Sequence, residues 1–252
     1  MSIAGNPMQS GKTDPQFFPA GDGALVVQFG EEIDPAVNRR AARFTGRVER
    51  AGLRGIRELI PTFCTVAVVY DPCLTTYDKL VRQLRRLLPD GQDGAAGVRR
   101  IHVLPVCYGG EMGPDLPFVA RHSGLTEQEV VQCHSDRDYL IYMLGFLPGF
   151  SYLGGLDHRL ITPRLTTPRT KIPAGSVGIG GEQTGVYPLD SPGGWQLIGR
   201  TPVRPYDPCR EPAILYRAGD YIRFSPVTPE EYRALERDVA AGCYRHILLE
   251  EA

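Results

Sequence analysis

Residues 145–202 read GFLPGFSYLGGLDHRLITPRLTTPRTKIPAGSVGIGGEQTGVYPLDSPGGWQLIGRTP, a stretch that is dense in glycine and proline and holds the only tryptophan, Trp195. Neither glycine nor proline suits a helix interior, because glycine is too flexible and proline lacks an N–H donor. Large aromatic and branched side chains that need burial are interleaved with them: Phe146, Phe150, Tyr152, Leu153, Val177, Ile179, Tyr187, Trp195, Leu197 and Ile198. The pattern therefore predicts short strands and tight turns in a β-barrel or sandwich with functional loops.

The composition of the whole chain is that of an ordinary globular protein. It has 252 residues, of which 42% are hydrophobic and 23% charged, and its net charge of -1 favours neither nucleic acid nor a membrane surface as a partner. The first residues lack the apolar core of a secretory signal. The six cysteines are scattered without a CxxC pair, which favours free thiols in a reducing compartment. We expect a cytoplasmic protein without a metal site.

The N-terminal part of the chain predicts a small α+β domain after a mobile tail at residues 1–16. Strands are expected at 24–29, 56–60, 65–70 and 100–107, and helices at 35–51 and 77–88. This order is typical of a split βαβ, or ferredoxin-like, unit. The last strand could close this domain or open the next. We place the boundary near residue 98, after a polar Gly-rich loop, so the domains are 17–98 and 99–252.

The second domain is predicted to carry helices around its strands. Asp115 is expected to cap a short helix that ends at Gly124, and Thr126 and Thr228 each begin a capping box. A strand is expected at 138–144, and two more strands at 213–224. The helix that begins at Thr228 is expected to end near residue 241.

Known catalytic and nucleotide-binding motifs are incomplete in this sequence. Glycines 175 and 180 have the spacing of a P-loop, but Gly181 stands where that motif needs lysine. A Rossmann fingerprint fails at Gln183, and the two serines near glycine, Ser151 and Ser176, lack a full nucleophile elbow. The five histidines show no ligand spacing. The residues alone therefore predict no complete active site.

Two features of the Gly- and Pro-rich stretch remain as candidate binding elements. Arginine suits bidentate contacts with carboxylate or phosphate, although a solvated or carbonyl-bonded set is the plain alternative. Six cations lie among the turns of this stretch and just after it: Arg159, Arg164, Arg169, Lys171, Arg200 and Arg204. Glycines at 175, 178, 193 and 194 allow backbone amides to approach a ligand beside Trp195. The alternative is that they form barrel corners around a buried Trp195.

Three long motifs in this region identify a family resemblance. MLGFLPGFSYLGGL (143–156), TPRTKIPAGSVGIGGEQTGVYP (167–188) and SPGGWQLIGRTP (191–202) resemble the B subunits of bacterial ATP-dependent 5-oxoprolinases, formerly called allophanate hydrolase subunit 1. The match is extended by GDGALVVQFG (21–30), the Pro61-Thr62-Phe63 segment and PVCYGGEMGPDL (105–116), and it covers about residues 20 to 232. The same family includes the sensor-kinase inhibitor KipI, and it is related to the carboxyltransferase domain of urea carboxylases.

The resemblance implies a fold, a reaction and partners. The fold is α+β, with a small ferredoxin-like N-terminal domain followed by a cyclophilin-like β-barrel domain that ends in a helix. The partners are the C subunit, itself a biotin-dependent carboxyltransferase-like barrel protein, and the separate A subunit. Together they hydrolyse 5-oxo-L-proline to L-glutamate at the expense of ATP with Mg, which the complex holds without a Walker motif in this chain.

Nine residues are the candidates for binding substrate or phosphate. We expect Arg169 and Lys171 to bind a carboxylate or phosphate, and amides near Gly175, Ser176 and Gly178 to face developing negative charge. Gln183, Trp195 and Gln196 would frame the ligand, with Tyr152 beside it. An alternative function is inhibition of a histidine kinase through the exposed Pro and aromatic residues of LPGFSYL. Amide carboxylation and, on the barrel architecture alone, prolyl isomerisation are weaker alternatives.

Overall fold

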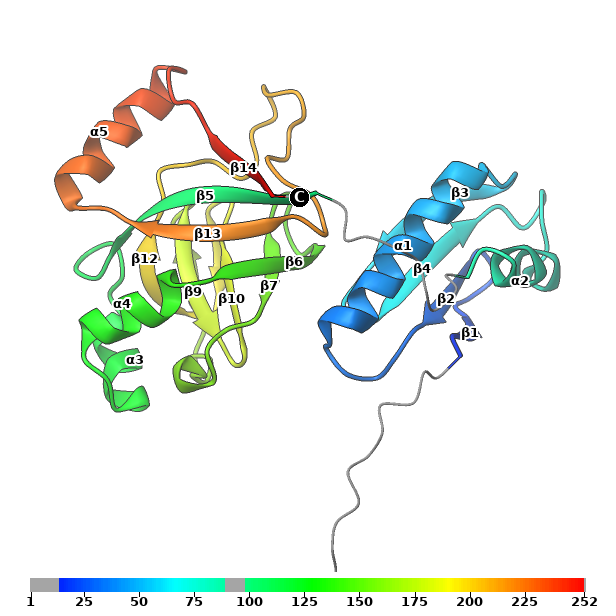
Figure 1. The fold of residues 1–252 in the computed structure, drawn as a ribbon, viewed down its shortest axis with the longest axis horizontal. Coiled ribbons are helices and arrows are strands. Elements are labelled where there is room, and N and C mark those ends of the chain that lie inside the picture. Colours follow the sequence, from blue (N-terminus) through cyan, green and yellow to red (C-terminus); the bar gives the residue numbers. More distant parts are fainter. Residues whose placement is uncertain (1–13, 89–97, 252) are drawn as a thin grey trace, which may run out of the picture. The chain divides into compact units, whose positions relative to one another are not determined.

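The computed structural model describes residues 14–88 and 98–251, which belong to two compact units that divide between residues 91 and 92 (Figure 1). Each unit has its own hydrophobic core. The predicted α+β class with a β-barrel is confirmed. All six cysteines are free thiols. No helix of the described residues is long and apolar enough to cross a membrane.

The first unit contains a four-stranded antiparallel sheet covered by two helices. The strands follow the order β1 (Gln16–Pro19), β2 (Ala24–Gln28), β4 (Thr65–Tyr70) and β3 (Ile56–Pro61). Helices α1 (Pro35–Ala51) and α2 (Tyr77–Arg85) connect or follow these strands. This is the ferredoxin-like order with one change, because β1 pairs with β2 at the edge where the fourth strand of that fold belongs. The strand predicted at 100–107 belongs to the second unit.

Local signals explain the first helix and its packing. The Asp34 side chain accepts hydrogen bonds from the amides of Ala36 and Val37 at 2.8 and 3.0 Å, and Pro35 fills the first turn. Buried residues at helical spacing, including Ala41, Phe44 and Val48, pack on the sheet.

The second unit is a closed barrel of seven strands with an eighth strand added at its edge. Its strands are β5 (Arg99–Tyr108), β6 (Asp138–Leu144), β7 (Ser151–Gly154), β9 (Ser176–Gly180), β10 (Gln183–Val186), β12 (Gln196–Arg200), β13 (Tyr221–Pro226) and β14 (Ile247–Glu251). They follow the order β12-β9-β10-β7-β6-β13-β5-β14, and pairing of β12 with β5 closes the ring. Closure removes most exposed strand edges.

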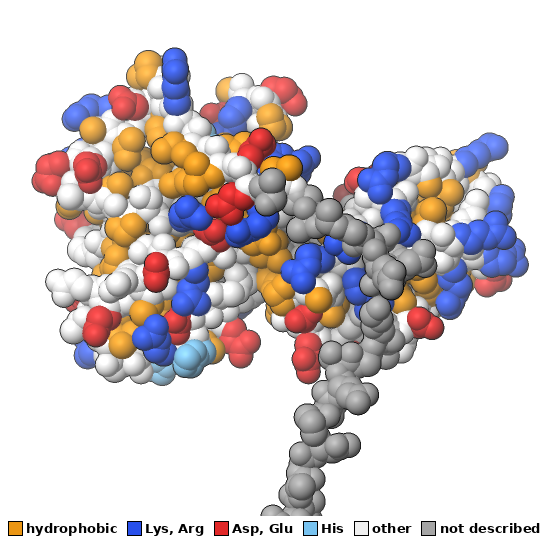
Figure 2. Space-filling view, viewed as in Figure 1, with side chains coloured by type: hydrophobic (Ala, Val, Ile, Leu, Met, Phe, Trp, Pro, Cys, Tyr) orange, Lys and Arg blue, Asp and Glu red, His pale blue; other side chains and the backbone are white. Residues whose placement is uncertain are grey.

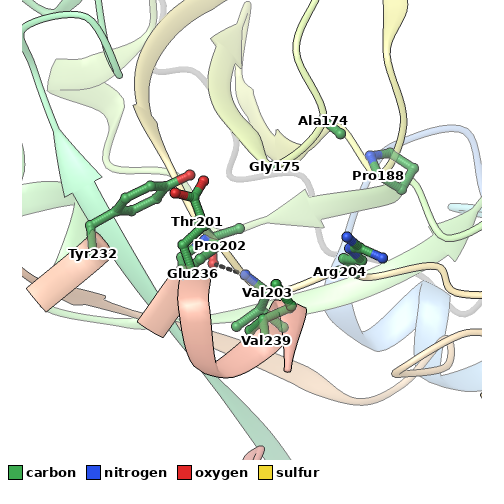
Figure 3. A pocket seen from close by; sticks show the side chains of 11 residues that line it. Ala174, Gly175, Pro188, Thr201, Pro202, Val203, Arg204, Tyr232, Glu236 and Val239 are labelled. Atoms are coloured by element: carbon green, nitrogen blue, oxygen red, sulfur yellow. Dashed lines mark hydrogen bonds between the residues drawn. The ribbon is translucent and has the colours of Figure 1, made fainter. Parts of the chain in front are cut away.

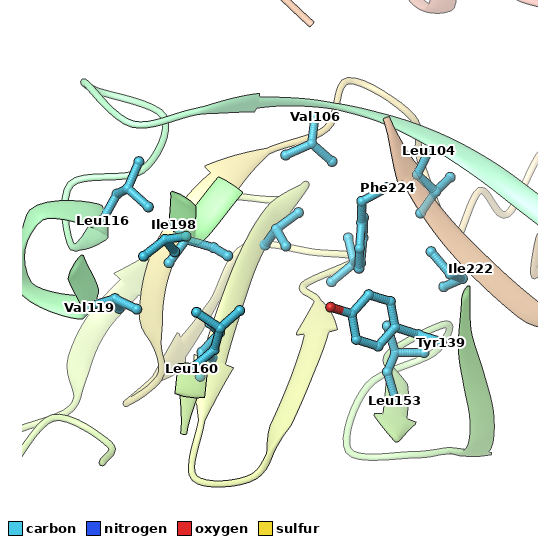
Figure 4. Packing of buried hydrophobic residues seen from close by; sticks show 14 of the residues in the cluster. Leu104, Val106, Leu116, Val119, Tyr139, Leu153, Leu160, Ile198, Ile222 and Phe224 are labelled. Carbon is cyan, nitrogen blue, oxygen red and sulfur yellow. The ribbon is translucent and has the colours of Figure 1, made fainter. Parts of the chain in front are cut away.

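The barrel is filled by aliphatic and aromatic side chains from strands and helices (Figure 4). Phe224, Tyr139 and Leu153 meet near its centre, and Val119 and Leu160 enter from outside the barrel strands. Helices α3 (Leu116–Ser123) and α4 (Glu127–Ser135) and the 3-10 helix η1 (His158–Leu160) lie together over one end. The capping boxes predicted at Thr126 and Thr228 are both present, the second at the start of α5 (Pro229–Ala240).

A chain of hydrogen bonds runs through the buried interior of the barrel unit. The Thr184 hydroxyl donates to the Gly178 carbonyl at 3.0 Å, so it accepts from Nε2 of His134 at 2.8 Å. Nδ1 of His134 is then an acceptor, and the Tyr108 hydroxyl donates to it at 2.8 Å. Burial lowers the pKa of His134 from 6.5 to about 3, which keeps the ring neutral.

The structure corrects one expectation about the strands and contains two strands that were not predicted. The first of the two strands predicted at 213–224 is absent, because both edges of β13 are already paired with β5 and β6. Residue 214 instead forms an isolated bridge with Tyr206. Strands β1 and β14 were not predicted.

Charged side chains of both signs are mixed over the visible face of the second unit, as a net charge of -1 leads us to expect (Figure 2).

Candidate functional site

A small two-stranded ribbon defines the candidate site on the barrel unit. It consists of β8 (Arg169–Ile172) and β11 (Ser191–Gly193), which pair antiparallel. A separate buried cluster goes with this ribbon and includes Ile172 from β8: Phe150, Ile172, Tyr187, Trp195 and Leu197. On β9, Val177 and Ile179 point into the barrel core, so Gly178 and Gly180, which alternate with them, face the opposite side, toward Trp195.

Three glycines in the barrel wall make room for the Trp195 ring. A Cβ atom on Gly180 would lie 2.5 to 2.6 Å from three atoms of the indole. A Cβ atom on Gly178 would lie 3.2 Å from the Trp195 Cβ, and one on Gly185 would lie 3.1 Å from the ring. None of these glycines has positive φ, so space rather than backbone freedom is what they supply. This packing favours the interpretation in which Trp195, only 4% exposed, is surrounded by barrel wall.

Asp115 ties the ribbon to the barrel through Arg169. One carboxylate oxygen accepts from Nη2 of Arg169 at 2.7 Å, and the other accepts from the Leu197 amide at 2.7 Å. The expected capping of α3 by Asp115 is only partly met, because the residue stands at the N-cap but its side chain makes no cap bond. Nη1 of Arg169 is buried and has no hydrogen-bond partner in the described chain. Asp115 therefore fixes the position of the Arg169 side chain, and Nη1 of Arg169 has no partner within the described chain.

Other members of the candidate set surround Tyr187 and Trp195. The guanidinium of Arg164 lies 5.7 Å from the centre of the Trp195 ring. Burial raises the pKa of Tyr187, and the charges of Arg164 and Arg169 oppose that rise, which places both cations near its hydroxyl. Tyr152 contacts Phe150 edge to face with ring centres 5.0 Å apart. We call this group, Tyr152, Arg164, Arg169, Tyr187 and Trp195, the Trp195 face.

Several predicted cations are already paired with carboxylates. Lys171 lies 2.9 Å from Asp190, which raises the pKa of the ammonium group. Arg159 and Asp157 form charge-assisted hydrogen bonds that hold the pKa of the carboxyl well below its usual range. Among the cations of this stretch, Arg169 and Arg200 each have a buried nitrogen that lacks a partner in the described chain, and of these two Arg169 belongs to the ribbon.

The remaining candidates lie in or beside the barrel wall. Gln196 is buried and its side-chain amide donates to the Pro163 carbonyl at 2.9 Å, which fixes the loop before Arg164. Gly178 stands in a strand paired on both sides, and Gln183 pairs with Gly180. Ser176 is fully buried, and its hydroxyl has no partner in the described chain. Gly175 has φ +81 and lines a cavity at the other end of β12.

Two residues of interest were not among the predicted site residues. Asp115 lies in the motif segment 105–116, but only the folded chain brings it to Arg169, 54 positions away. Phe146 is 62% exposed and has φ 65, a conformation that is rare for a bulky residue and often marks a functional loop. Its ring contacts Phe150 at 5.6 Å between centres, so it borders the Trp195 face.

The chemistry that this arrangement supports is the binding of one anionic group. A guanidinium with a spare nitrogen suits a single carboxylate or phosphoryl group. The described residues contain no group of three or more His, Cys, Asp or Glu residues that could hold a metal ion.

Comparison with known sequences assigns most of the chain to one family. The family model described as carboxyltransferase domain, subdomain C and D, matches residues 15–216. The 5-oxoprolinase B subunit of Bacillus subtilis (strain 168) is 41% identical over 228 residues, which cover 86% of this chain and 95% of that protein. The 5-oxoprolinase B subunit of Escherichia coli O157:H7 is 44% identical over 207 residues, which cover 82% and 93%.

Solved structures show the same fold inside longer chains. The crystal structure of TTHA0988 matches with a TM-score of 0.73 and 37% identity over 81% of this chain and 40% of that one. The urea amidolyase of K. lactis matches with a TM-score of 0.80 over 99% of this chain, but at 24% identity it supports the fold alone. This chain spans 40% of the first structure and 17% of the second.

Proposed function

This chain belongs to the carboxyltransferase-domain family of subdomains C and D that includes the 5-oxoprolinase B subunits, and on that premise we propose that it is the B subunit of a 5-oxoprolinase. The observation that carries the proposal is 41% identity across 95% of the Bacillus subtilis B subunit. In this proposal the chain acts with the A and C subunits, and the complex hydrolyses 5-oxo-L-proline to L-glutamate. The free cysteines agree with a cytoplasmic location.

The Trp195 face is the part of the chain that we assign to the substrate. Arg169, oriented by Asp115, would bind the substrate carboxylate or a phosphorylated amide oxygen through its guanidinium group, since the side chain is 31% exposed. Lys171 would add positive charge beside it, although it already pairs with Asp190. Tyr152 would form the apolar side of the site, which the buried Trp195 supports from within the barrel wall, and Gln196 would hold the neighbouring loop. The other half of the site would come from the C subunit.

ATP with Mg is proposed to bind to the assembled complex and to activate the ring amide by phosphorylation. The sequence has no Walker motif, and the assigned site depends on one guanidinium group, that of Arg169. This chain would therefore contribute substrate binding and contacts with the other subunits rather than the nucleotide site.

Co-expression of this chain with the A and C subunits of the same host tests the proposal. We expect 5-oxoproline-dependent ATP hydrolysis and glutamate release only when all three chains are present. A preparation of the three co-purified chains that releases no glutamate from 5-oxoproline and ATP would contradict the assignment.

Substitution of Arg169 tests the assigned site. Arg169→Gln should raise KM for 5-oxoproline about tenfold or more, because hydrogen bonds to charged groups contribute roughly 1.5–3 kcal/mol. Arg169→Lys keeps the charge but loses the forked geometry of the guanidinium, so its KM for 5-oxoproline should lie between those of the native chain and Arg169→Gln. The matched control is Arg57→Gln, since Arg57 is 66% exposed and pairs with Asp71 in the other unit. Equal KM values for Arg169→Gln and the control would remove Arg169 from the site.

One observation favours a second candidate function, inhibition of a histidine kinase. The strained, exposed Phe146 stands in the loop just before the Pro- and aromatic-rich segment that the kinase-inhibitor alternative requires. For that function, the chain should bind a histidine kinase of its host in a pull-down, and Phe146→Ser should abolish binding. Tight binding to the C subunit together with no kinase binding would reject it.

A further inference from the structure

A cavity of about 180 Å³ lies between helix α5 and the turn after β12 (Figure 3). Its lining includes Gly175, Thr201, Arg204, Tyr232 and Glu236. Trp195 precedes the first residue of β12, whereas Thr201 follows the last, so the cavity and the Trp195 face stand at opposite ends of this strand.

Arg204 and Glu236, which carry opposite charges, both line this cavity but do not form an ion pair with each other. Figure 3 shows Glu236 beside Tyr232 on one side and the Arg204 guanidinium on the other. Neither Arg204 nor Glu236 forms an ion pair within the described residues. Burial raises the pKa of the Tyr232 hydroxyl, and the nearby Glu236 carboxylate raises it further, so this carboxylate already faces the hydroxyl. A molecule placed between the two sides would therefore meet a cation and an anion.

The wall beside the cavity has unused hydrogen-bonding groups. Nε of Arg200 and the hydroxyl of Ser176 are buried without a partner in the described chain, and these residues pair across β12 and β9. Arg200 lies next to Gly175, since a Cβ atom on that glycine would stand 3.4 Å from Cγ of Arg200. Neither Arg200 nor Ser176 lines the cavity, so its charged contacts with an occupant come from Arg204 and Glu236.

We propose that this cavity binds a small zwitterion of the α-amino acid class, with its carboxylate on Arg204 and its ammonium group on Glu236. Arginine matches the two oxygens of a carboxylate, and the Glu236 carboxylate, which has no ion-pair partner in the described chain, suits an ammonium donor. A simple anion would be repelled by Glu236, and a simple cation by Arg204. The size agrees, because an apolar cavity of about 150 Å³ holds benzene, so this one admits about six to eight non-hydrogen atoms.

This site goes beyond the proposed function, since it uses none of the residues of the Trp195 face. The binding measurement needs only the purified full chain, without the A and C subunits or ATP. Failure of one proposal therefore leaves the other standing.

Calorimetric titration of the full chain with three probes of similar size tests the proposal. L-alanine carries both charges, propionate only the carboxylate and isopropylamine only the ammonium group. We expect L-alanine to bind at least about tenfold more tightly than either single-charge probe, because each hydrogen-bonded charge contributes to the affinity. Equal binding of propionate and L-alanine, or no heat with L-alanine at millimolar concentration, would overturn it.

Variants of the two charged residues locate the site. Arg204→Gln and Glu236→Gln should each weaken L-alanine binding about tenfold or more. Arg237→Gln and Asp238→Asn are the matched controls, since both residues are exposed on α5 and outside the cavity lining, and they should leave binding unchanged. Circular dichroism confirms that each variant is folded. If the controls weaken binding as much as the cavity variants, the site is elsewhere.

Discussion

Replacement of His134 by leucine is expected to destabilise the barrel unit by about 2–4 kcal/mol, because it leaves the buried Tyr108 hydroxyl without its partner and removes the stack on Phe224. The ring centres of His134 and Phe224 are 4.7 Å apart, and His134 is fully buried. Trp195 is the only tryptophan and lies in this unit, so its fluorescence during urea unfolding reports on the barrel alone.

The same histidine predicts how stability depends on pH. The folded state keeps His134 neutral down to its lowered pKa of about 3, whereas in the unfolded state it binds a proton below about 6.5. Stability is therefore present above pH 6.5 and is lost as the pH falls toward 3, by up to about 1.4 kcal/mol for each pH unit. His246, whose pKa burial and the neighbouring His102 lower to about 4, adds a loss of the same sign.

A glutamine variant separates the two effects. In His134→Gln the side chain still has an acceptor for Tyr108 and a donor for Thr184, but it does not titrate. Its stability at pH 7 should fall less than that of His134→Leu. Between pH 6 and pH 4 its unfolding free energy should change less steeply with pH than that of the native chain. The difference in slope should correspond to the one proton that His134 binds on unfolding. Parallel pH profiles for the two proteins would show that His134 is not held neutral.

Helix boundaries in this chain follow from local signals, whereas several strands do not. Asp34 with Pro35, and the capping boxes at Thr126 and Thr228, lie within a few residues of the groups they bond, so the sequence alone predicts them. Strand β14 forms because Ile247 meets Val103, a partner far away in the sequence. All its residues are exposed, so it has no alternating pattern to detect.

The candidate site shows the same division. The sequence supplies Arg169 and Trp195 through composition and motif membership, but not Asp115 as the partner of Arg169, because that contact joins α3 to the ribbon. An aspartate before an apolar helix is normally interpreted as a cap, and only the fold shows its side chain turned to Arg169 and Leu197 instead. Likewise, glycine spacing does not reveal what fills the space that each glycine leaves.

The space that Gly180 leaves for the Trp195 indole predicts the second large effect on stability. Gly180→Ala should destabilise the barrel unit by about 1–3 kcal/mol or more, because the added methyl would overlap three atoms of a rigid indole ring. The ring has little freedom to move, since Phe150 and Tyr187 pack edge to face against it with ring centres 5.6 and 6.3 Å away. The backbone at Gly180 does not have positive φ, so the expected loss comes from packing rather than from strain.

Gly194→Ala is the matched control, because Gly194 adjoins Trp195 but a Cβ atom there would make only ordinary contacts, the nearest at 3.6 Å from Pro168. It should change stability by less than about 0.5 kcal/mol. Shrinking the ring should relieve the clash, so Gly180→Ala combined with Trp195→Phe should cost less than the sum of the single changes when unfolding is followed by circular dichroism. Additive losses would mean that the methyl group and the indole do not compete for one space, and Gly180 would then need another explanation.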